Sequence, residues 1–499
     1  MNNKKLGFKK GRTFMANQMA EQEPLHFQSL SRICRQLKSG ALSSVALTQY
    51  MFERIHRLDG QTLSFARLLE EQALATAAAR DEARAQGQPL GALHGVPIAI
   101  KDLLYTKDIV TASGTLVMQD FRPTFDATVV TRLEQAGAVI IGKTQLTEGA
   151  FGHHHPDIPA PINPWDKRAW SGVSSSGSGV SVAAGLAFAA LGSDTGGSIR
   201  FPSASCGLVG LKPTYGRVSL YGAFPLAGSL DHIGPMTRSV EDAARMLSVM
   251  AGYDENDPGS VNASVPNYLA DVVAEDSNES SEVSFAGVRI GVDWDYVSTG
   301  VELQVSEVIR DTLDALSKLG AEICPVVVPE SYKILAGGWA VTTGVECAKA
   351  HSEFYPQQKA EYGPDLAALI DLGLRVTAED YAQLELIRQD FTAQMEQVLT
   401  QVDVMISPCM PMATPDIEVM SELSPEEGQA DFLTFTAPFD YSGHPTLTLP
   451  SALNTNGRPT SFQLVAVKLG EANLLKVGSM IEQSLPRLSY PELDQTGAE

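Results

Sequence analysis

The sequence predicts an α/β fold with a mainly parallel sheet. Short apolar runs such as "GVPIAIKD" at 95–102 and "AVIIG" at 138–142 alternate with segments of helical periodicity, which is the pattern of βα units. The 499 residues are 44% hydrophobic, which is enough to bury a large core. Because the alternation resumes at "VRIGVD" (288–293), we expect one large domain rather than two.

Residues 25–90 favour helices. The segment "SRICRQLKSG" places Ile33 and Leu37 on one face and ends at Gly40, and two longer segments of the same kind follow at 43–60 and 70–87. Beyond the strand that ends at Lys101, we expect further helices. They are predicted at 126–137, 180–188, 301–320 and 471–483.

Two segments differ from this pattern. Residues 1–24 begin with a cluster of Lys and Arg but lack the apolar stretch of a signal peptide, so we expect a disordered basic tail. The stretch from Asp254 to Glu282 holds eight acidic residues and no Lys or Arg, which indicates an exposed acidic loop or linker, set at 254–286. The folded domain is therefore expected at 25–490, with the acidic loop inside it.

Composition narrows the class of protein. The formal net charge is −22, from 37 Lys and Arg against 59 Asp and Glu, which argues against a nucleic-acid partner. The longest apolar run, 180–191, is too short to span a bilayer, so no membrane partner is expected. Five cysteines with no CxxC pair favour buried thiols in a reducing, cytoplasmic setting over disulfides or a zinc site.

The string "GAVIIGKT" at 137–144 matches the phosphate-binding pattern GxxxxGK[ST]. That pattern works when a glycine-rich loop after a strand turns its N–H groups toward phosphate. Here the four intervening residues are apolar and mostly β-branched, so they form the strand itself and leave no loop. We therefore interpret the string as structural, with a nucleotide-binding protein as an alternative from another class.

Two segments rich in glycine and serine flank the helix expected at 180–188. They are "SGVSSSGSG" at 171–179 and "GSDTGGSIR" at 192–200. One interpretation is a pair of tight turns in which glycines adopt positive φ and serines cap a helix. The other is a nucleophile, Ser198, that faces backbone N–H groups. Neither segment contains a histidine, so its residues alone do not show what accepts the proton of Ser198.

Longer blocks add a resemblance that covers nearly the whole chain, from about Leu25 to Gln483. They include "LHGVPIAIKD", "GAVIIGKTQLTEGAFG", "NPWD", "LGSDTGGSIRFPSASCGLVGLKPTYGRVS", "SLDHIGPMTRSVEDAA" and "GHPTLTLP". In these blocks the chain resembles the amidase signature family of Ser-cis-Ser-Lys hydrolases. The resemblance implies one α/β domain with a central mixed, twisted sheet covered by helices on both faces. It also implies that "GAVIIGKT" is an ordinary strand and turn.

By this resemblance, Ser198 is the acylated nucleophile, Ser174 the bridging cis-serine and Lys101 the base. A lysine at its ordinary pKa of about 10.4 is protonated and cannot act as a base, so Lys101 must be desolvated. The oxyanion of the tetrahedral intermediate needs preorganised N–H donors. The candidates are the backbone N–H groups of Thr195, Gly196, Gly197 and Ser198. We expect Asp194 and Arg200 to brace this loop rather than to take part in the chemistry.

The chain departs from the family pattern beside the cis-serine. Val173 and Ser176 stand where the family has glycines in GGSSGG. A non-proline cis bond costs about 2.5–4 kcal/mol, and a β-branched residue adds restriction at Val173. A catalytically impaired homologue is therefore one alternative. Another is the glutaminase (A) subunit of a tRNA-dependent amidotransferase, which is disfavoured because its arginine-bearing stretch is replaced by the sequence at 362–381.

The remaining expectations concern ligands. The histidines His153, His154 and His155 lie in a segment that runs beside the acyl-binding cleft in the family, so they are candidate substrate contacts. Adjacent histidines in an extended segment alternate sides, and no acidic or cysteine partner is spaced nearby, so no metal site is expected. The function expected is hydrolysis of a small carboxylic amide to an acid plus ammonia or an amine, with no cofactor. The resemblance also implies that the protein could be a homodimer.

Overall fold

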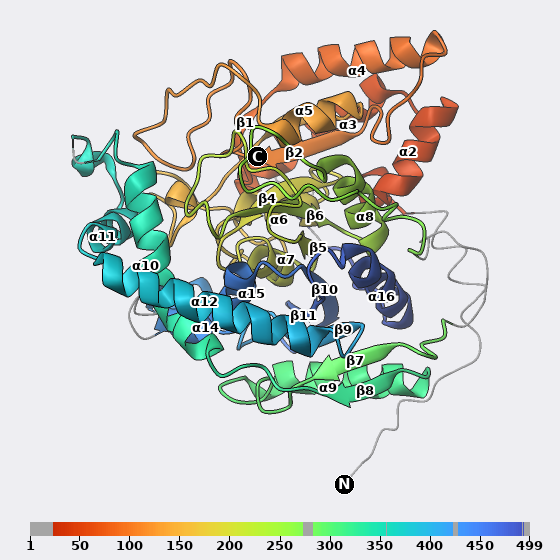
Figure 1. Ribbon diagram of the computed structural model, residues 1–499. Coiled ribbons are helices and arrows are strands. Elements are labelled where there is room, and N and C mark those ends of the chain that lie inside the picture. Colours follow the sequence, from red (N-terminus) through yellow and green to blue (C-terminus); the bar gives the residue numbers. More distant parts are fainter. Residues whose placement is uncertain (1–22, 273–282, 356, 423–427, 492, 494–499) are drawn as a thin grey trace.

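The computed structural model describes residues 23–491 apart from 273–282, 356 and 423–427, and also residue 493. Its described residues form a single 11-stranded sheet with helices on both faces (Figure 1). In spatial order the strands are β1 (Phe65–Leu68), β3 (Val139–Thr144), β2 (Pro97–Lys101), β4 (Ala190–Asp194), β6 (His232–Thr237), β5 (Val209–Lys212), β10 (Thr446–Leu453), β11 (Pro459–Val465), β9 (Val404–Pro408), β7 (Arg289–Val292) and β8 (Glu322–Pro325).

The sheet is mixed, as the family resemblance implied, so the expectation of a mainly parallel sheet was wrong. Strand β2 runs parallel to β3 and β4, and β7 runs parallel to β8 and β9. Between these two parallel groups, β6, β5, β10 and β11 pair antiparallel. Within this antiparallel centre, β10 and β11 form a hairpin, whose turn includes Gly457 with a φ of 75°.

The helices found in the described residues follow the predicted alternation only in part. Those at 332–350, 364–373 and 378–399 were not predicted and succeed one another without a strand between them, and the helix expected at 180–188 is found at 176–183. In chain order the helices are α2 (Leu30–Ser39), α3 (Ser44–Thr62), α4 (Glu70–Ala85), α5 (Thr128–Gln135), α6 (Ser176–Ala183), α7 (Arg200–Cys206), α8 (Val240–Met250), α9 (Leu303–Lys318), α10 (Tyr332–Ala350), α11 (Pro364–Gly373), α12 (Ala378–Leu399), α13 (Ile417–Glu422), α14 (Gly428–Leu433), α15 (Ala437–Ser442) and α16 (Glu471–Ser484).

Side chains of the central strands show that α7 and α16 cover opposite faces. A Cβ on Gly210 would meet Ser203 of α7, whereas Leu447 reaches Gly478 of α16. Gly210 and Leu211 are neighbours on β5, and Leu211 pairs directly with Leu447. Because successive residues of a strand point to opposite faces, the two helices lie on opposite sides of the sheet. This confirms the layered architecture implied by the resemblance.

Local signals at helix ends were reliable. The side chain of Ser29 accepts the N–H of Arg32 at the start of α2, and Gly40 ends this helix with a φ of 78°. The helices expected at 43–60 and 70–87 are α3 and α4. The short strand β1 lies between them and was missed, because its four half-buried residues are too few for a clear periodicity.

The acidic stretch is a loop in its described residues, but its beginning is not exposed. Asp254 accepts hydrogen bonds from the hydroxyls of Thr128 and Ser219 at 2.5 and 2.6 Å, and Asp257 accepts the N–H of Leu220. Both carboxylates are buried, so this part of the loop packs against the domain. Residues 273–282 and nearly all of the expected tail at 1–24 lie outside the described residues.

None of the helices in the described part of the chain is both long enough and apolar enough to cross a bilayer.

Candidate active site

Lys101 lies at the carboxyl end of β2 and is fully buried. Its Nζ donates hydrogen bonds to the Oγ atoms of Ser174 at 2.6 Å, Ser193 at 2.8 Å and Ser175 at 2.9 Å. Burial lowers the pKa of Lys101 to about 7, although the carboxylates of Asp194 and Asp231 act in the opposite direction. A lysine with this pKa is neutral in a large fraction of molecules at pH 7, so it can accept a proton.

The two serine segments meet in front of this lysine. The peptide bond between Val173 and Ser174 is cis, and the N–H of Ser175 donates to the carbonyl of Ser198 at 3.2 Å. Ser174 has no exposed surface, whereas Ser198 is 7% exposed. Within the described residues, the Oγ of Ser198 makes no hydrogen bond. Of the three serines, Ser198 is therefore the one that combines access to solvent with a free hydroxyl.

Ser175 and Ser193 are partners of Lys101 that sequence reasoning missed. The Oγ of Ser175 also donates to the carbonyl of Ser193 at 3.1 Å, so the two serines are fixed relative to each other. A signal for Ser193 was present, because it is a polar residue near the end of the otherwise apolar strand before Asp194. Strand β4 is the parallel neighbour of β2, which brings the ends of both strands to the same edge.

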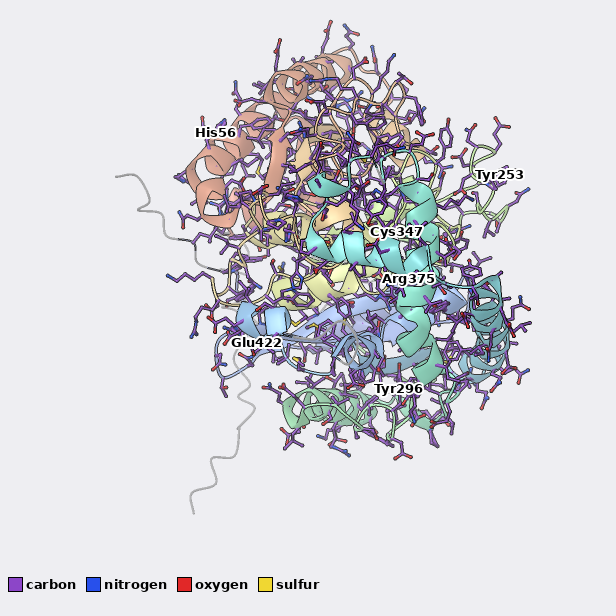
Figure 2. All side chains as sticks on the ribbon, turned by 90° about the vertical axis from the view of Figure 1, so that its left-hand side faces the viewer. His56, Tyr253, Tyr296, Cys347, Arg375 and Glu422 are labelled. Atoms are coloured by element: carbon purple, nitrogen blue, oxygen red, sulfur yellow. The ribbon has the colours of Figure 1, made fainter. Side chains whose placement is uncertain are left out.

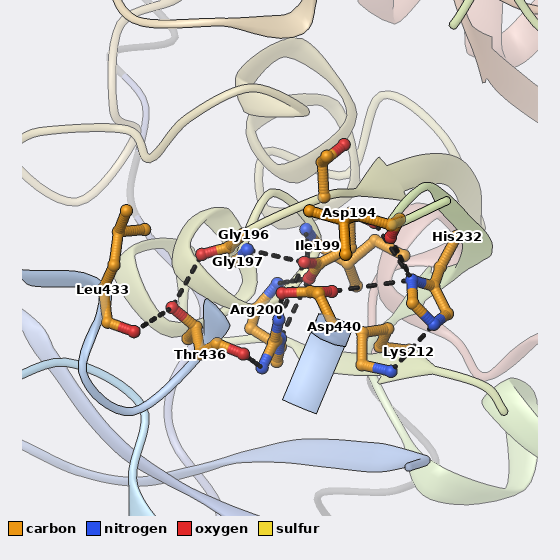
Figure 3. A network of polar contacts seen from close by, with 12 residues as sticks. Asp194, Gly196, Gly197, Ile199, Arg200, Lys212, His232, Leu433, Thr436 and Asp440 are labelled. Carbon is orange, nitrogen blue, oxygen red and sulfur yellow. Dashed lines mark hydrogen bonds and ion pairs between the residues drawn. The ribbon is translucent and has the colours of Figure 1, made fainter. Parts of the chain in front are cut away.

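Asp194 organises the loop that carries Ser198. Its carboxylate accepts the N–H of Gly197 at 2.5 Å and that of Ile199 at 3.0 Å, and it also binds the guanidinium of Arg200 (Figure 3). Burial alone would raise the pKa of Asp194, but the charge of Arg200 and these donors hold it well below its usual range. This supports the expectation that Asp194 and Arg200 brace the loop.

Arg200 also binds a second carboxylate, which comes from a distant part of the chain. Its Nη2 lies 2.6 Å from Asp440 of α15, and neither side chain has exposed surface (Figure 3). Burial, together with the nearby charge of Asp194, raises the pKa of Asp440 well above its usual range. One guanidinium therefore keeps Asp194 ionised, while Asp440 retains its proton more readily. Burial also lowers the pKa of the neighbouring Lys212 to about 7.

The N–H groups of the nucleophile loop, defined as residues 194–198, differ in their availability. The N–H of Gly197 is donated to Asp194 at 2.5 Å. The N–H groups of Thr195, Gly196 and Ser198 make no hydrogen bond within the described residues. Gly197 has a φ of 132°, and a Cβ there would lie 2.3 Å from Phe201, so glycine is required at this position.

Two carbonyls of the nucleophile loop are bound by side chains that sequence reasoning missed. The Nε1 of Trp339, on α10, donates to the carbonyl of Thr195 at 2.8 Å. The Oγ1 of Thr436, just before α15, donates to the carbonyl of Gly196 at 2.6 Å (Figure 3). Both residues are more than a hundred positions away from the loop in the sequence, so no local pattern marks them.

Comparison with known proteins identifies the family. The family model described as Amidase matches residues 46–475.

The chain belongs to the amidase family.

Among the relatives of this amidase is AmiD of Mycobacterium bovis, a protein named as an amidase. It is 42% identical over 455 residues, which cover 91% of this chain and 93% of AmiD. The glutamyl-tRNA(Gln) amidotransferase of Chromohalobacter salexigens has an A-type subunit that is 36% identical, with 92% of this chain and 97% of that relative covered. A crystal structure of an amidase matches with a TM-score of 0.79 and 31% identity, covering 92% of this chain and all of the other. The protein is thus a hydrolase that acts on amide bonds.

The three adjacent histidines of this amidase have different surroundings. His153 is exposed and its Nδ1 lies 2.6 Å from Asp365 of α11. His155 is buried, and its Nδ1 accepts the N–H of Asp157. His154 points toward the site, because its Nε2 lies 3.1 Å from the Oγ of Ser176. Burial lowers the pKa of His154 to about 4, and the nearby charges of His153 and Lys101 add to this effect. Of the three rings, that of His154 therefore contacts the serine-rich segment at 171–179.

No group of three or more metal-ligating side chains occurs in the part of the chain that the structure describes.

The string "GAVIIGKT" has the structural role that we expected. Its residues Val139–Thr144 form the fully buried strand β3. The Nζ of Lys143 donates to the carbonyl of Leu104 at 2.7 Å and lies 3.3 Å from the carboxylate of Asp102. With this lysine bound inside the core, the string has neither the loop nor the free cation of a phosphate site.

Replacing Lys143 by alanine is expected to destabilise the amidase by about 3–5 kcal/mol, because it leaves the carboxylate of Asp102 buried without its nearest cation. Urea unfolding followed by circular dichroism measures the loss. The control is Lys333→Ala, which removes a solvent-exposed lysine paired with Glu330 and is expected to leave the stability nearly unchanged, because water screens this ion pair. Equal stability of the two variants would contradict the assignment of Lys143 to the core.

Proposed function

We propose that this amidase hydrolyses a carboxylic amide to an acid plus ammonia or an amine through an acyl-enzyme on Ser198. Ser174 passes the proton and Lys101 accepts it. The observation that carries this proposal is the fully buried Lys101, with its pKa lowered to about 7 and its Nζ 2.6 Å from the Oγ of Ser174. A buried lysine whose partners are three hydroxyls, and no carboxylate, is placed to act as a base.

The proposed reaction has two halves. First, the Oγ of Ser198 bonds to the amide carbon, its proton moves to Ser174, and the proton of Ser174 moves to Lys101. The C–N bond then breaks as the proton returns along the same route to the leaving nitrogen. Next, water attacks the ester and gives up its proton through the same groups. The C–Oγ bond then breaks, and Ser198 regains its proton as the acid leaves.

The negative oxygen formed in each half needs N–H donors. The resemblance offered Thr195, Gly196, Gly197 and Ser198 as candidates. Because the N–H of Gly197 is already donated to Asp194, we propose that those of Thr195, Gly196 and Ser198 supply the oxyanion hole. His154 is proposed as a contact for the substrate beside them.

The first test is intact-protein mass spectrometry after exposure to a broad serine-reactive fluorophosphonate. The expected result is one adduct on the wild type, mapped to Ser198, and none on the matched control Ser198→Ala. An adduct on the control, or a site other than Ser198 in the wild type, would overturn the assignment of the nucleophile. A folded wild type that gains no adduct would favour the alternative of a catalytically impaired homologue.

The similarity to an amidotransferase component supplies a second candidate, a glutaminase that works with partner subunits. A stand-alone amidase is expected to turn over a panel of simple amides without added protein. Hydrolysis of glutamine alone among these amides, and only after addition of the other amidotransferase subunits, would favour the second candidate instead. A cytoplasmic location and a homodimer stay proposals, and size-exclusion chromatography with light scattering tests the latter.

A further inference from the structure

Two consecutive peptide planes of the nucleophile loop are each held by a side chain from a distant element. The carbonyl of Thr195 accepts the indole N–H of Trp339, and the carbonyl of Gly196 accepts the hydroxyl of Thr436. We propose that Trp339 and Thr436 are positioning residues that aim the N–H of Gly196 at the developing oxyanion. This inference rests on the proposed function, because it assumes that Ser198 is the nucleophile.

The geometry of the peptide bond links these contacts to the N–H. The bond between Thr195 and Gly196 is trans, since the cis bond found in the described residues joins Val173 and Ser174. In a planar trans peptide the C=O and the following N–H point in opposite directions. With the Thr195 carbonyl bound to Trp339, the N–H of Gly196 must point away from the indole. Within the described residues, the N–H of Gly196 donates no hydrogen bond.

Thr436 fixes the plane on the other side of Gly196, as Figure 3 shows. The carbonyl of Thr436 also accepts Nη1 of Arg200 at 3.0 Å, and Arg200 binds Asp194, which accepts the N–H of Gly197. The peptide between Gly196 and Gly197 is therefore held at its oxygen and at its nitrogen by one closed ring of contacts. Glycine has the greatest backbone freedom of any residue, so a Gly–Gly pair needs such external bonds to keep one orientation.

The ring of Trp339 also explains why residue 196 is a glycine. A Cβ there would lie 2.7 Å from the indole, so any larger residue would push the loop away from Trp339. The indole itself is only 5% exposed and stacks on Phe151, with ring centroids 5.9 Å apart. Helix α10, which carries Trp339, lies on the side of the molecule that faces the viewer in Figure 2, where Cys347 is labelled. The indole is thus held by its contact with Phe151 as well as by its hydrogen bond to Thr195.

Trp339→Phe tests the proposal, because it removes the indole N–H and keeps an aromatic ring against Phe151. The measured quantity is the second-order rate constant for fluorophosphonate labelling of Ser198. In this reaction the Oγ–P bond forms as the proton of Ser198 passes through Ser174 to Lys101, the P–F bond breaks and fluoride leaves, and negative charge develops on the phosphoryl oxygen in the transition state. Because one oxyanion donor is misdirected, we expect labelling to slow by about 10- to 100-fold. The stoichiometry of one adduct and the pH midpoint of labelling should stay unchanged, because the proton route is intact.

The matched control is Trp165→Phe. The Nε1 of Trp165 also donates to a backbone carbonyl, that of Cys206, at 2.8 Å. The Trp165→Phe variant therefore loses the same kind of hydrogen bond, but outside the nucleophile loop. Labelling of this control is expected at the wild-type rate. If Trp339→Phe labels at the wild-type rate, or if both variants slow equally, Trp339 has no positioning role. If the wild type itself does not label, it is the proposed function that fails.

A second pair of variants keeps the proposal testable if Trp339→Phe does not fold. Thr436→Val has nearly the shape of threonine but lacks the hydroxyl, and Thr436→Ser retains it. We expect slow labelling in the valine variant and recovery to within about threefold of wild type in the serine variant. Equal rates in the two variants would show that the hydroxyl of Thr436 does not position the loop.

Discussion

Replacing Lys101 by methionine is expected to slow acylation of Ser198 by about 10²- to 10⁴-fold, because the variant has no base to receive the proton from Ser174. Methionine has a similar length and no charge, so it fills the buried site without a new desolvation cost. The fold should therefore be retained by circular dichroism. The rate is measured as fluorophosphonate labelling or as turnover of any amide found to be a substrate. Labelling of Lys101→Met at close to the wild-type rate would eliminate the lysine mechanism.

The pH dependence of the wild type provides an independent check. Lys101 acts as a base only when neutral, and burial lowers its pKa to about 7. As the pH rises toward 7, the neutral fraction increases, so the rate should rise about tenfold per unit well below 7 and level off above it. Lys101→Met should lose this step. A wild-type rate that is constant between about pH 5 and 9 would show that another group controls proton transfer.

Arg200→Leu is expected to lower the free energy of unfolding by about 3–5 kcal/mol and to abolish most labelling of Ser198. Its guanidinium lies between Asp194 and Asp440, and none of the three side chains is exposed. Without it, the ionised carboxylate of Asp194 is left buried without its cation, and Asp440 loses its partner, which is among the costliest changes a core can undergo. Because Asp194 binds the N–H groups of Gly197 and Ile199, the two neighbours of Ser198, disturbing it also displaces Ser198. Denaturant unfolding and labelling measure the two effects.

Arg458→Leu is the matched control for this prediction. Arg458 also binds two carboxylates, those of Asp166 and Asp416, but these are 18% and 43% exposed and can be hydrated when the cation is removed. We expect a smaller loss of stability than for Arg200→Leu and unchanged labelling. If Arg200→Leu were no less stable than this control, the buried network would not be what supports the loop.

Much of the fold could be predicted because its signals are local. The apolar periodicity of α2, the serine that caps it and Gly40 at its end all lie within a dozen residues. The strand that ends at Lys101 could also be predicted, because it is a short, mostly apolar run in the sequence; it forms the fully buried β2. The antiparallel centre was missed, although the Asn456–Gly457 pair between two apolar runs is a hairpin signal.

In the candidate site, too, some residues could be identified from the sequence and others could not. Lys101, Ser174 and Ser198 were named through the family resemblance, and the structure places Lys101 against Ser174 and the backbone of Ser198 against that of Ser175. Trp339 and Thr436 could not be predicted, because their roles arise from contacts across more than a hundred residues of chain. A tryptophan in a helix is usually a core residue, and nothing beside Trp339 in the sequence indicates that its N–H meets the nucleophile loop.

The position of the β10–β11 hairpin has a consequence for synthesis of the protein. Both strands lie in the middle of the sheet, although they come from residues 446–465, near the end of the chain. Until they emerge from the ribosome, β5 is an unpaired edge, and β7 and β8 have no link to the first six strands. All three proposed catalytic residues are made long before that point, but Thr436 and Asp440 are not. The nascent chain therefore carries its nucleophile without the groups that hold it in place, and a truncated product would be both inactive and prone to aggregate.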